Sequence, residues 1–523
     1  MPRRTLLVTL IAATALVVSA TMAWAMGGGG LWKSGGQDLS NNRHASTESK
    51  ISPANVGDLD VKWAFTTGGD VSATPAVDGT NVYVPDWAGN LFAIDRETGA
   101  EVWGRQLSDY TGVPGNFSRN TPAVHGNALI LGDQGGRSFA GATVMAVDKH
   151  TGDLLWSSKV EAHPASIITQ SPVVFGNRVY VGVSSLEELF AVDPSYPCCT
   201  FRGSLVALDA NTGEIVWKTY TAPDIEGYSG NAVWGPTPAV DPQRGSVYVT
   251  TGNNYTVPED VLECVAANDG DPDAVAACIS PDNHFDSVMA LDLATGEIKW
   301  ATRALPFDAW TVACLFGGEN CTSPSGPDLD FGEGPALFTV HDGGQPRELL
   351  GAGQKSGQYW ALDPDTGDVV WVTKAGPGGV LGGLIWGSAV DGERVYVANG
   401  NTARLPWDLV GGEPVNYGFW SALDAATGEI LWQTPDPQGF VNQGPATVAN
   451  GVMYACSLDV DGHMYAMDAA TGDVLWSFAS GGSCNAGAAV VNGTVYWGSG
   501  YASLADFLGS TGNDQLYAFE VGQ

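Results

Sequence analysis

One pattern of apolar and polar positions recurs along the chain and predicts its secondary structure. An apolar strand ends in Ala-x-Asp, a turn of the form x-x-Thr-Gly follows, and a second apolar strand ends in Trp. Alternating apolar positions on either side of a short Asp/Thr/Gly turn are typical of a β-hairpin. The sequence therefore predicts seven such hairpins, at residues 91–103, 144–156, 205–217, 288–300, 359–371, 420–432 and 464–476.

An eighth copy of the pattern is divided between the two ends of the sequence. Residues 515–519, QLYAF, supply its first half, and Trp63 in DVKWAF supplies a closing strand that has no first half before it. Two chain ends that complete one blade close the ring of a β-propeller and protect its sheet edges. The segments 74–84 and 171–181 repeat as further strands. We therefore predict an all-β fold, one eight-bladed β-propeller of four-stranded antiparallel blades over residues 26–523.

The recurring Trp and Gly residues are expected to be structural. Each Trp would pack against the neighbouring blade, and each Gly would allow a turn conformation that a Cβ opposes. The loops are longest between the closing residues Trp217, Trp300 and Trp371. Because binding chemistry tends to lie on loops of a rigid scaffold, we expect a site in this region.

Charge narrows the range of partners. The 523 residues include 23 Lys and Arg against 57 Asp and Glu, which gives a formal net charge of −34. A surface this acidic repels phosphate backbones, so nucleic acid is not an expected partner.

The first 25 residues have the features of an export signal. Arg3 and Arg4 precede an apolar stretch at 6–18, and Ala23 and Ala25 frame a cleavage site of the small-x-small type. The stretch is short for a membrane anchor, although an uncleaved anchor is the alternative. No later segment is apolar enough to span a bilayer, so we expect a periplasmic or secreted protein.

Eight cysteines behind an export signal indicate disulfide bonds. The sequence contains no Cys-x-x-Cys-His motif, so a covalently attached haem is not expected. The order of the cysteines offers the local pairs Cys198–Cys199, Cys264–Cys278, Cys314–Cys321 and Cys456–Cys484.

Two segments between the repeats carry a family resemblance. Residues 32–59 contain Trp, a Gly/Asp stretch, Asn-x-Arg and Asn-Val-x-x-Leu, and this order is similar to the start of the quinoprotein alcohol dehydrogenases. The segment YPCCTFRGSLVALD, at 196–209, resembles their polyvinyl alcohol dehydrogenase branch. With the repeats, the resemblance covers nearly the whole mature chain. It implies an alcohol substrate, with pyrroloquinoline quinone (PQQ) and Ca²⁺ as cofactors.

The chemistry implied by this resemblance needs particular groups. The quinone carries the redox work, and a cation bound by oxygens withdraws charge from the quinone carbonyl. A carboxylate takes the alcohol proton as hydride leaves carbon.

The resemblance also implies which residues hold the metal and the ring. In the family, the metal-binding Glu ends a Ser-Ser-x-x-Glu motif. Alignment of the Ser-Ser pair in VSSLEEL selects Glu188, whereas an alignment without gaps selects Glu187. The family's Asn ligand matches Asn253 in YVTTGNN. Its ring-stacking Trp matches Trp234, one strand upstream of that Asn.

Further matches orient the cofactor. Lys355 in GAGQKSGQYWALD stands where relatives carry a cation that points at the reactive quinone carbonyl, where it would stabilise negative charge on that oxygen. Arg119 matches an Arg that binds a cofactor carboxylate, and Thr169 and Ser184 match polar cofactor contacts.

The Cys198–Cys199 pair resembles a ring disulfide that lies over the cofactor in these enzymes. In methanol dehydrogenases the cysteine pair comes before the element that Arg119 matches. In this sequence the pair comes after Glu187 and Glu188, as it does in the polyvinyl alcohol branch. Pairing of either cysteine with another partner is the alternative.

The catalytic base departs from the family pattern. Relatives have Pro-x-Asp-x-Trp-Asp-Phe, with the Asp after Trp as base, but here Thr311 follows PFDAW. The segment DFGEGPALF resembles the continuation of that pattern. We therefore infer an insertion that carries Cys314 and Cys321, after which Asp330 supplies the base.

Asp308 and Asp328 are the alternative bases. Lanthanide-using relatives carry a further Asp two residues beyond the base, and Gly332 occupies that position here. The resemblance therefore favours calcium over a lanthanide.

The leading hypothesis is oxidation of a primary or secondary alcohol to the aldehyde or ketone, with a polymeric secondary alcohol such as polyvinyl alcohol as the first candidate substrate. A small alcohol or a sugar alcohol is the runner-up. Electrons would pass to a separate cytochrome c or another acceptor, since no haem motif is present. The alternative of another class is a cofactor-free exported propeller that serves as a binding scaffold or in outer-membrane assembly. Such a scaffold has no reason to keep the Glu, Asn, Trp and Lys set.

Overall fold

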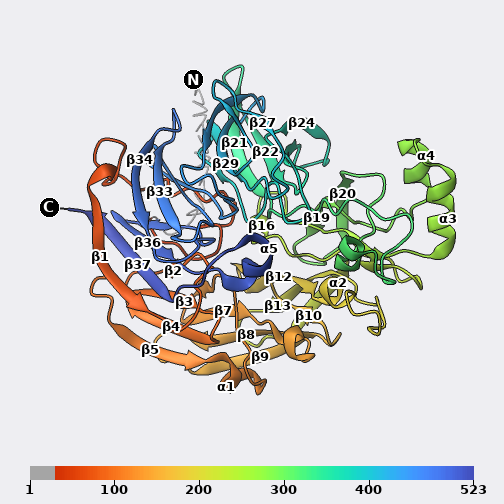
Figure 1. Cartoon of the computed structure of the whole chain (residues 1–523). Helices are drawn as coiled ribbons and strands as arrows, with labels where there is room; N and C mark the ends of the chain where they lie inside the picture. The colour runs from red at the N-terminus through yellow and green to blue at the C-terminus, as the bar shows by residue number, and fades with distance from the viewer. Residues whose placement is uncertain (1–29, 523) are drawn as a thin grey trace, which may run out of the picture.

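The structure is a computed structural model that describes residues 30–522. Eight small antiparallel sheets form a ring (Figure 1), which confirms the all-β, eight-bladed propeller predicted from the repeats. In each blade the strand that carries the closing Trp is at the outer edge of the sheet, as β1, β5 and β9 show at the rim of Figure 1. The predicted export signal, residues 1–25, lies outside the described residues.

Four strands make each blade. The first four blades are β2(Ala76–Val77), β3(Asn81–Pro85), β4(Asn90–Asp95) and β5(Glu101–Gln106); β6(Ala123–His125), β7(Ala128–Gly132), β8(Ala142–Asp148) and β9(Leu154–Glu161); β11(Val173–Phe175), β12(Arg178–Ser185), β13(Ser204–Asp209) and β14(Ile215–Tyr220), with β10(Ser166–Ile167) also paired to β12; and β16(Ala239–Asp241), β17(Ser246–Thr250), β19(Ser287–Asp292) and β20(Ile298–Arg303). The last four are β21(Ala336–Asp342), β22(Gln345–Gly353), β23(Gln358–Leu362) and β24(Val369–Lys374); β25(Ala389–Val390), β26(Arg394–Asn399), β29(Phe419–Asp424) and β30(Ile430–Pro435); β31(Thr447–Ala449), β32(Val452–Cys456), β33(His463–Asp468) and β34(Val474–Ala479); and β35(Ala489–Val491), β36(Thr494–Gly498), β37(Gln515–Val521) and β1(Leu59–Thr66).

The eighth blade closes the ring with both ends of the chain, as the divided repeat predicts. Strand β1 pairs antiparallel with β37, so that Leu59 lies opposite Val521 and Thr66 opposite Gln515. The edge that an open sheet would expose is thereby paired.

The closing Trp of a blade docks on the turn of the next blade. Trp156 donates its indole N–H to the carbonyl of Ala210, at 3.0 Å, in the turn between β13 and β14. Gly213 in this turn has a φ of +74°, and a Cβ there would lie 2.5 Å from the Trp156 ring. Glycine therefore provides both the backbone conformation and the space for the ring. The equivalent indole hydrogen bond is made by Trp63, Trp103, Trp217, Trp300, Trp432 and Trp476.

Gly213→Ala is expected to lower the free energy of unfolding by about 3 kcal/mol, because the new methyl group meets Trp156 and the backbone is strained. Gly176→Ala, in the β11–β12 turn of the same blade, is the matched control. Gly176 also has positive φ, at +59°, but open space around its Cβ position. This control should lose only about 1 kcal/mol. Thermal melting of both variants measures the difference, and equal losses would contradict the docking role of the glycine.

Residues 31–50, which we call the N-terminal strap, contact seven of the eight blades. Arg43 anchors the strap: its buried guanidinium donates to the carbonyls of Gly35 and Ala446 and to the hydroxyls of Thr74 and Thr447. The strap therefore ties together blades that are remote in sequence. Its other contacts with the blades are Trp32 with Val77, Lys33 with Val124, Leu39 with Val240, Ser40 with Leu337, Asn42 with Val390, His44 with Val448 and Glu48 with Gly493.

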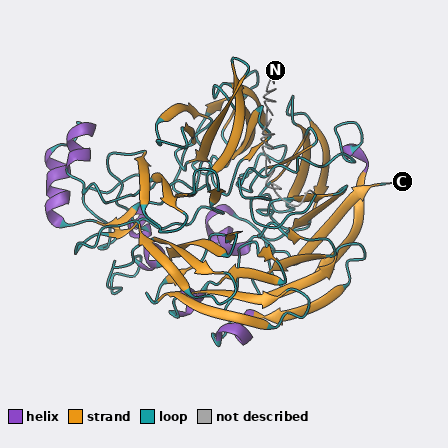
Figure 2. Cartoon of the chain, turned by 180° about the vertical axis from the view of Figure 1, so that it is seen from behind, coloured by secondary structure: helices purple, strands orange, loops and turns teal. Residues whose placement is uncertain are grey.

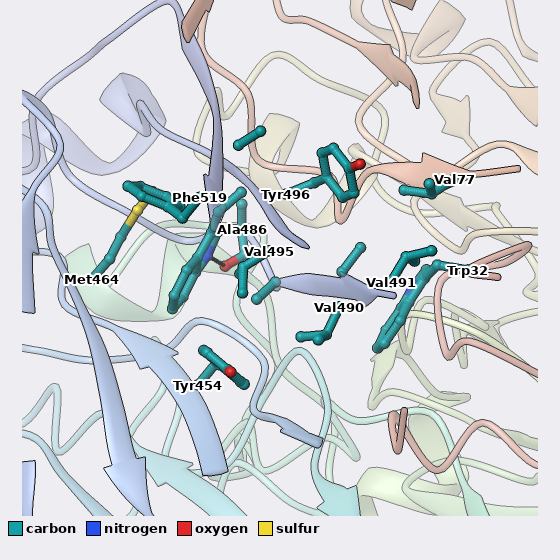
Figure 3. Close-up of a cluster of buried hydrophobic side chains, with 14 of the residues drawn as sticks. Trp32, Val77, Tyr454, Met464, Ala486, Val490, Val491, Val495, Tyr496 and Phe519 are labelled. Carbon is teal, nitrogen blue, oxygen red and sulfur yellow. Dashed lines mark hydrogen bonds between the residues drawn. The ribbon is translucent and has the colours of Figure 1, made fainter. Parts of the chain in front are cut away.

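The strap also shares a hydrophobic core with the closing blade. Figure 3 shows Trp32 beside Val491 of β35, in a buried cluster that includes Val77 and Phe519. All four side chains are fully or almost fully buried. Burial of this apolar surface stabilises the strap, the first blade and the last blade together.

Helices lie in the loops between strands (Figure 2). Cys264–Cys278 joins α3 to the end of α4, and all four predicted disulfides are present. No helix within residues 30–522 is long and apolar enough to cross a membrane. The helices are α1(Leu107–Thr111), α2(Glu187–Phe190), α3(Glu259–Ala267), α4(Pro272–Ala277) and α5(Ala505–Leu508), with 3-10 turns at Val56–Asp58, Gly135–Ser138, Val312–Phe316 and Ala502–Leu504. Two further pairs of short strands are antiparallel: β15(Ser229–Gly230) with β18(Asn254–Thr256), and β27(Trp407–Asp408) with β28(Pro414–Val415).

Candidate active site

Four of the predicted site residues meet where the fourth and fifth blades adjoin. Trp234 precedes β16, Asn253 follows β17, Asp330 precedes β21 and Lys355 follows β22. Propeller strands carry these loops to one place although the residues span more than a hundred positions in sequence. Gly252 permits the approach, because a Cβ there would lie 2.8 Å from the Oδ2 atom of Asp330.

The carboxylate of Asp330 is held in one orientation. Its Oδ1 atom accepts the backbone N–H of Asn253 at 2.9 Å, and its Oδ2 atom accepts the indole N–H of Trp234 at 2.9 Å. The Nζ atom of Lys355 lies 3.3 Å from the same Oδ2 atom and 2.6 Å from Oδ1 of Asp328. Lys355 is only 8% exposed, so its ammonium group depends on these carboxylates in place of water.

These charges set the protonation of the buried lysine. Burial alone would lower the pKa of Lys355, but the negative charges of Asp328, Asp330 and Glu188 outweigh burial and raise the pKa above its ordinary value. The lysine therefore stays cationic at neutral pH.

The two glutamates of α2 have different surroundings. Burial raises the pKa of Glu188 to about 8; the Lys355 cation opposes this effect, and the negative charges of Asp330 and Asp308 add to it. Glu188 therefore faces the charged cluster. Glu187 is turned away into hydrogen bonds with the disulfide loop, where its Oε2 atom accepts the backbone N–H groups of Thr200 at 2.8 Å and Phe201 at 2.7 Å.

The two alternative bases have other partners. Asp308 accepts the backbone N–H groups of Asp328 at 3.1 Å and Leu329 at 2.8 Å, so it shapes the loop that presents Asp330. Burial raises the pKa of Asp308 to about 6, and the charge of Asp330 adds to this effect. Asp328 is the closer partner of the Lys355 ammonium group.

The residues after Thr311 form the loop that the sequence predicts as an insertion. They contain the 3-10 turn Val312–Phe316, which Cys314–Cys321 closes. Asn320 donates its amide N–H groups to the carbonyls of Ala191 and Asp193, both at 3.1 Å, and so ties this loop to the end of α2. The loop therefore packs beside the helix that carries Glu188.

Arg119, Thr169 and Trp386 line a cavity that Trp234 adjoins through Trp386. The guanidinium carbon of Arg119 lies 4.5 Å from the ring centre of Trp386, and one of its nitrogens donates to the hydroxyl of Tyr501 at 3.0 Å. The rings of Trp386 and Trp234 meet edge to face at 5.5 Å. Trp234 therefore links the cavity to the charged cluster.

The sequence interpretation missed Trp386 and Tyr501. A signal for Trp386 is present, because Trp-Gly precedes the first strand of the sixth blade at 386–387 just as it precedes that of the fourth at 234–235. Trp386 has a φ of +71°, which is unusual for a bulky side chain and often marks a functional site. Tyr501 lies outside the repeats and gives no comparable signal.

The vicinal disulfide lies near the same site. Cys198 and Cys199 are bonded, and Cys199 packs with Trp234 against one buried cluster that includes Phe201. Ser184 is buried at the end of β12, close in sequence to α2. A contact between these residues and a cofactor stays a prediction.

Known proteins resemble this chain in sequence and in fold. A family model described as outer membrane protein assembly factor BamB matches residues 25–302 and 355–517. The polyvinylalcohol dehydrogenase of a Pseudomonas species is 32% identical, over 94% of this chain and 77% of that protein. The one from Sphingopyxis sp. strain 113P3 is also 32% identical, over 95% and 77%.

The chain belongs to the quinoprotein alcohol dehydrogenase superfamily. Its place is with the polyvinyl alcohol dehydrogenase branch, and it is an oxidoreductase of this type. The crystal structure of a quinohemoprotein alcohol dehydrogenase from Comamonas testosteroni has the same fold, with a TM-score of 0.70 over 94% of this chain and 80% of that one at 20% identity. BamB from Moraxella catarrhalis shares the fold more distantly, with a TM-score of 0.53 over 88% of this chain and 99% of that one at 15% identity. The quinoprotein family and the assembly factor thus share a propeller scaffold, and the site must distinguish their functions.

Proposed function

We propose that this quinoprotein oxidises an alcohol with PQQ and Ca²⁺, and that Asp330 accepts the hydroxyl proton. The observation that carries the proposal is the carboxylate of Asp330, fixed by Trp234 and Asn253 beside the ammonium group of Lys355. A buried carboxylate that is oriented in this way and paired with a cation fits general-base catalysis.

The lining of this cavity offers polar groups for one edge of a polar, anionic ring compound such as PQQ. The indole N–H of Trp386 and the amide oxygen of Asn485 are buried beside it without a hydrogen-bond partner among the described residues. Buried polar atoms need partners, so these two support a polar ligand in the cavity. Arg119 would bind a cofactor carboxylate, with Thr169 as a further polar contact, and Trp234 would stack on the ring. When bound, PQQ accepts the two electrons that leave the alcohol.

Glu188 and Asn253 suit a calcium ion. Asn253 donates its amide N–H groups to the carbonyls of Asn254 and Trp310, both at 2.8 Å, which turns its amide oxygen away from them. Carboxylate and amide oxygens are hard ligands that Ca²⁺ prefers. The carboxyl groups of Glu188, Asp330 and Asp308 lie near one another and outnumber the ammonium group of Lys355, so a bound cation would balance them.

The metal would need ligands beyond these two side chains. Within residues 30–522, no group of three or more His, Cys, Asp or Glu side chains has the spacing of a metal site. Further oxygens from the backbone, water or the cofactor would complete the coordination. We assign the carboxylate ligand to Glu188, since both oxygens of Glu187 are occupied by Tyr196, Thr200 and Phe201.

The residues of the chain then have separate tasks. Asp330 takes the hydroxyl proton, because its Oδ1 atom keeps a lone pair beyond the one hydrogen bond that it accepts. Lys355 places positive charge where negative charge develops during oxidation. The loop closed by Cys314–Cys321 packs beside α2 and helps to exclude water.

A polymeric secondary alcohol is the proposed substrate, because the relatives at 32% identity are named for polyvinyl alcohol. A small or sugar alcohol is the alternative. Electrons would pass to a separate cytochrome c or another acceptor, since the sequence has no haem attachment motif. The four disulfides support a periplasmic or secreted location.

The test is reconstitution of chelator-treated apoprotein with PQQ and Ca²⁺, followed by dye reduction with several alcohols. Activity should require both additions, and PQQ should bind with measurable affinity. Glu188→Gln should need about tenfold more Ca²⁺ or more for half-maximal activity, because one negative ligand is lost. Glu259→Gln, at an exposed position on α3, is the matched control and should behave as the unmodified protein.

The cofactor-free scaffold is the second candidate, supported by the description of the matching family model. Absence of PQQ binding and of dye reduction with every alcohol would favour it. For such a scaffold, Glu188→Gln should behave like the unmodified protein, with no PQQ binding and no dye reduction in either.

A further inference from the structure

An apolar groove of about 370 Å³ opens on the surface beside the proposed site. Three of its side chains are strongly exposed for their type: Phe139 at 58%, Leu189 at 44% and Val192 at 42%. Clusters of exposed apolar side chains on a soluble surface usually mark a binding site. The full lining is Phe139, Leu189, Phe190, Val192, Asp193 and Tyr196.

The groove is continuous with the proposed site through α2. Glu188 faces the charged cluster from this helix, and the next two residues, Leu189 and Phe190, line the groove. Tyr196, in the wall of the groove, donates its hydroxyl to Glu187, which also holds the disulfide loop. A ligand in the groove therefore contacts the same helix that carries the group proposed to bind the metal.

The loop closed by Cys314–Cys321 extends the apolar surface. Its 3-10 turn exposes Leu315 at 46% and Phe316 at 68%, and it contacts α2. Asn320 fixes this loop against the α2 segment through the carbonyl of Asp193. Apolar side chains from loops of the second, third and fourth blades thus face one region next to the site.

The chemistry of the groove indicates what it binds. The rings of Phe139 and Phe190 pack together, with centres 5.0 Å apart and planes tilted by 31°, and form an apolar wall. Its lining has no basic residue, and it offers the carboxylate of Asp193 and the hydroxyl of Tyr196 as hydrogen-bonding groups. A chain that alternates methylene and hydroxymethine groups matches both features, since its methylenes cover apolar surface and its hydroxyls donate to oxygen.

We infer that this groove binds the aliphatic backbone of a polymeric secondary alcohol next to the carbon that is oxidised. The inference rests on the proposed function and deepens it. It makes the groove a determinant of polymer specificity that the chemistry at Asp330 does not need.

The test compares a long polyvinyl alcohol with 2,4-pentanediol, which has the same secondary alcohol groups without a polymer chain, on the PQQ- and Ca²⁺-loaded enzyme with a dye as acceptor. In the double variant Phe139→Ser/Leu189→Ser, kcat/KM for the polymer should fall at least tenfold, mainly through KM. With the diol it should stay within twofold. Leu155→Ser is the matched control, because Leu155 lies on the outer strand β9 and is 52% exposed. It should change neither value.

Direct binding of the polymer, measured by calorimetry, gives a second readout that needs no turnover. The unmodified protein should bind the polymer and the double variant should bind it at least tenfold more weakly. If kcat/KM and binding for the polymer are unchanged in the double variant, the inference is overturned. Oxidation of the diol in the same experiment would still support the proposed function. An equal loss on polymer and diol would overturn it as well, because the groove would then only support the site.

A protein electron acceptor is the rival occupant. If the double variant loses rate only when a cytochrome c replaces the dye, the groove is a docking surface for that acceptor and the inference is wrong. If the unmodified protein oxidises no alcohol at all, the proposed function fails. In that case loss of polymer binding in the double variant still supports the groove, and retained binding refutes it.

Discussion

Asp330→Asn should lower kcat about 10³-fold while the protein still folds and binds PQQ. The amide has nearly the volume of the carboxylate but cannot accept a proton at neutral pH, and loss of a general base costs about 10²- to 10⁴-fold. The affinity for PQQ should change little, because the quinone contacts proposed here come from Trp234, Arg119 and Lys355. Steady-state dye reduction and a fluorescence titration with PQQ measure the two quantities.

The alternative bases give the control for this assignment. Asp308→Asn and Asp328→Asn remove carboxylates that bind the backbone and Lys355, so each should retain more turnover than Asp330→Asn. If one of them loses turnover while Asp330→Asn remains active, the base is assigned to the wrong residue.

Lys355→Met should lower the free energy of unfolding by about 3–5 kcal/mol and reduce turnover at least 10²-fold. Removal of one partner from a buried ion pair leaves its carboxylates without compensation, and here both Asp328 and Asp330 lose their cation. Loss of the positive charge also removes stabilisation of charge that develops during oxidation. Thermal or urea unfolding of the cofactor-free protein measures the stability without a contribution from bound PQQ.

Two variants separate the charge effect from a general effect of losing a lysine. Lys355→Met/Asp328→Asn should recover part of the stability but none of the turnover, because one unpaired charge is removed while the cation is still missing. Lys299→Met, at a half-exposed lysine 3.5 Å from Asp292, should cost less than about 1 kcal/mol. Equal stability of Lys355→Met and the unmodified protein would contradict the burial argument.

The fold could be predicted because its signals are local and repeated. Each hairpin carries its own turn residues, and seven of the eight closing Trp residues are matched by a turn Gly one blade further on, as Trp156 is by Gly213. The divided repeat likewise indicated the pairing of β1 with β37. Local cysteine order was enough for the disulfides, since the bonded pairs lie close in sequence.

The site was predicted less completely because it depends on contacts between blades. The sequence left Glu187 and Glu188 unresolved, since the direction of each side chain is set by the disulfide loop and by Lys355. Trp386 was missed because its role arises from its packing against Arg119 and Trp234. The assignment of Asp330 rests on an insertion inferred from the sequence. The structure places Asp330 beside Trp234 and Lys355, and its role as base is a proposal.

The N-terminal strap has a consequence for biosynthesis. The ribosome makes the strap before the eight blades, yet the partners of the strap include Val448 and Gly493 in the seventh and eighth blades. The strap therefore cannot form all of its contacts until the seventh and eighth blades have been translated. A chain that stops before residue 489 would lack both Gly493 and β37, so the end of the strap and strand β1 would each stay without a partner.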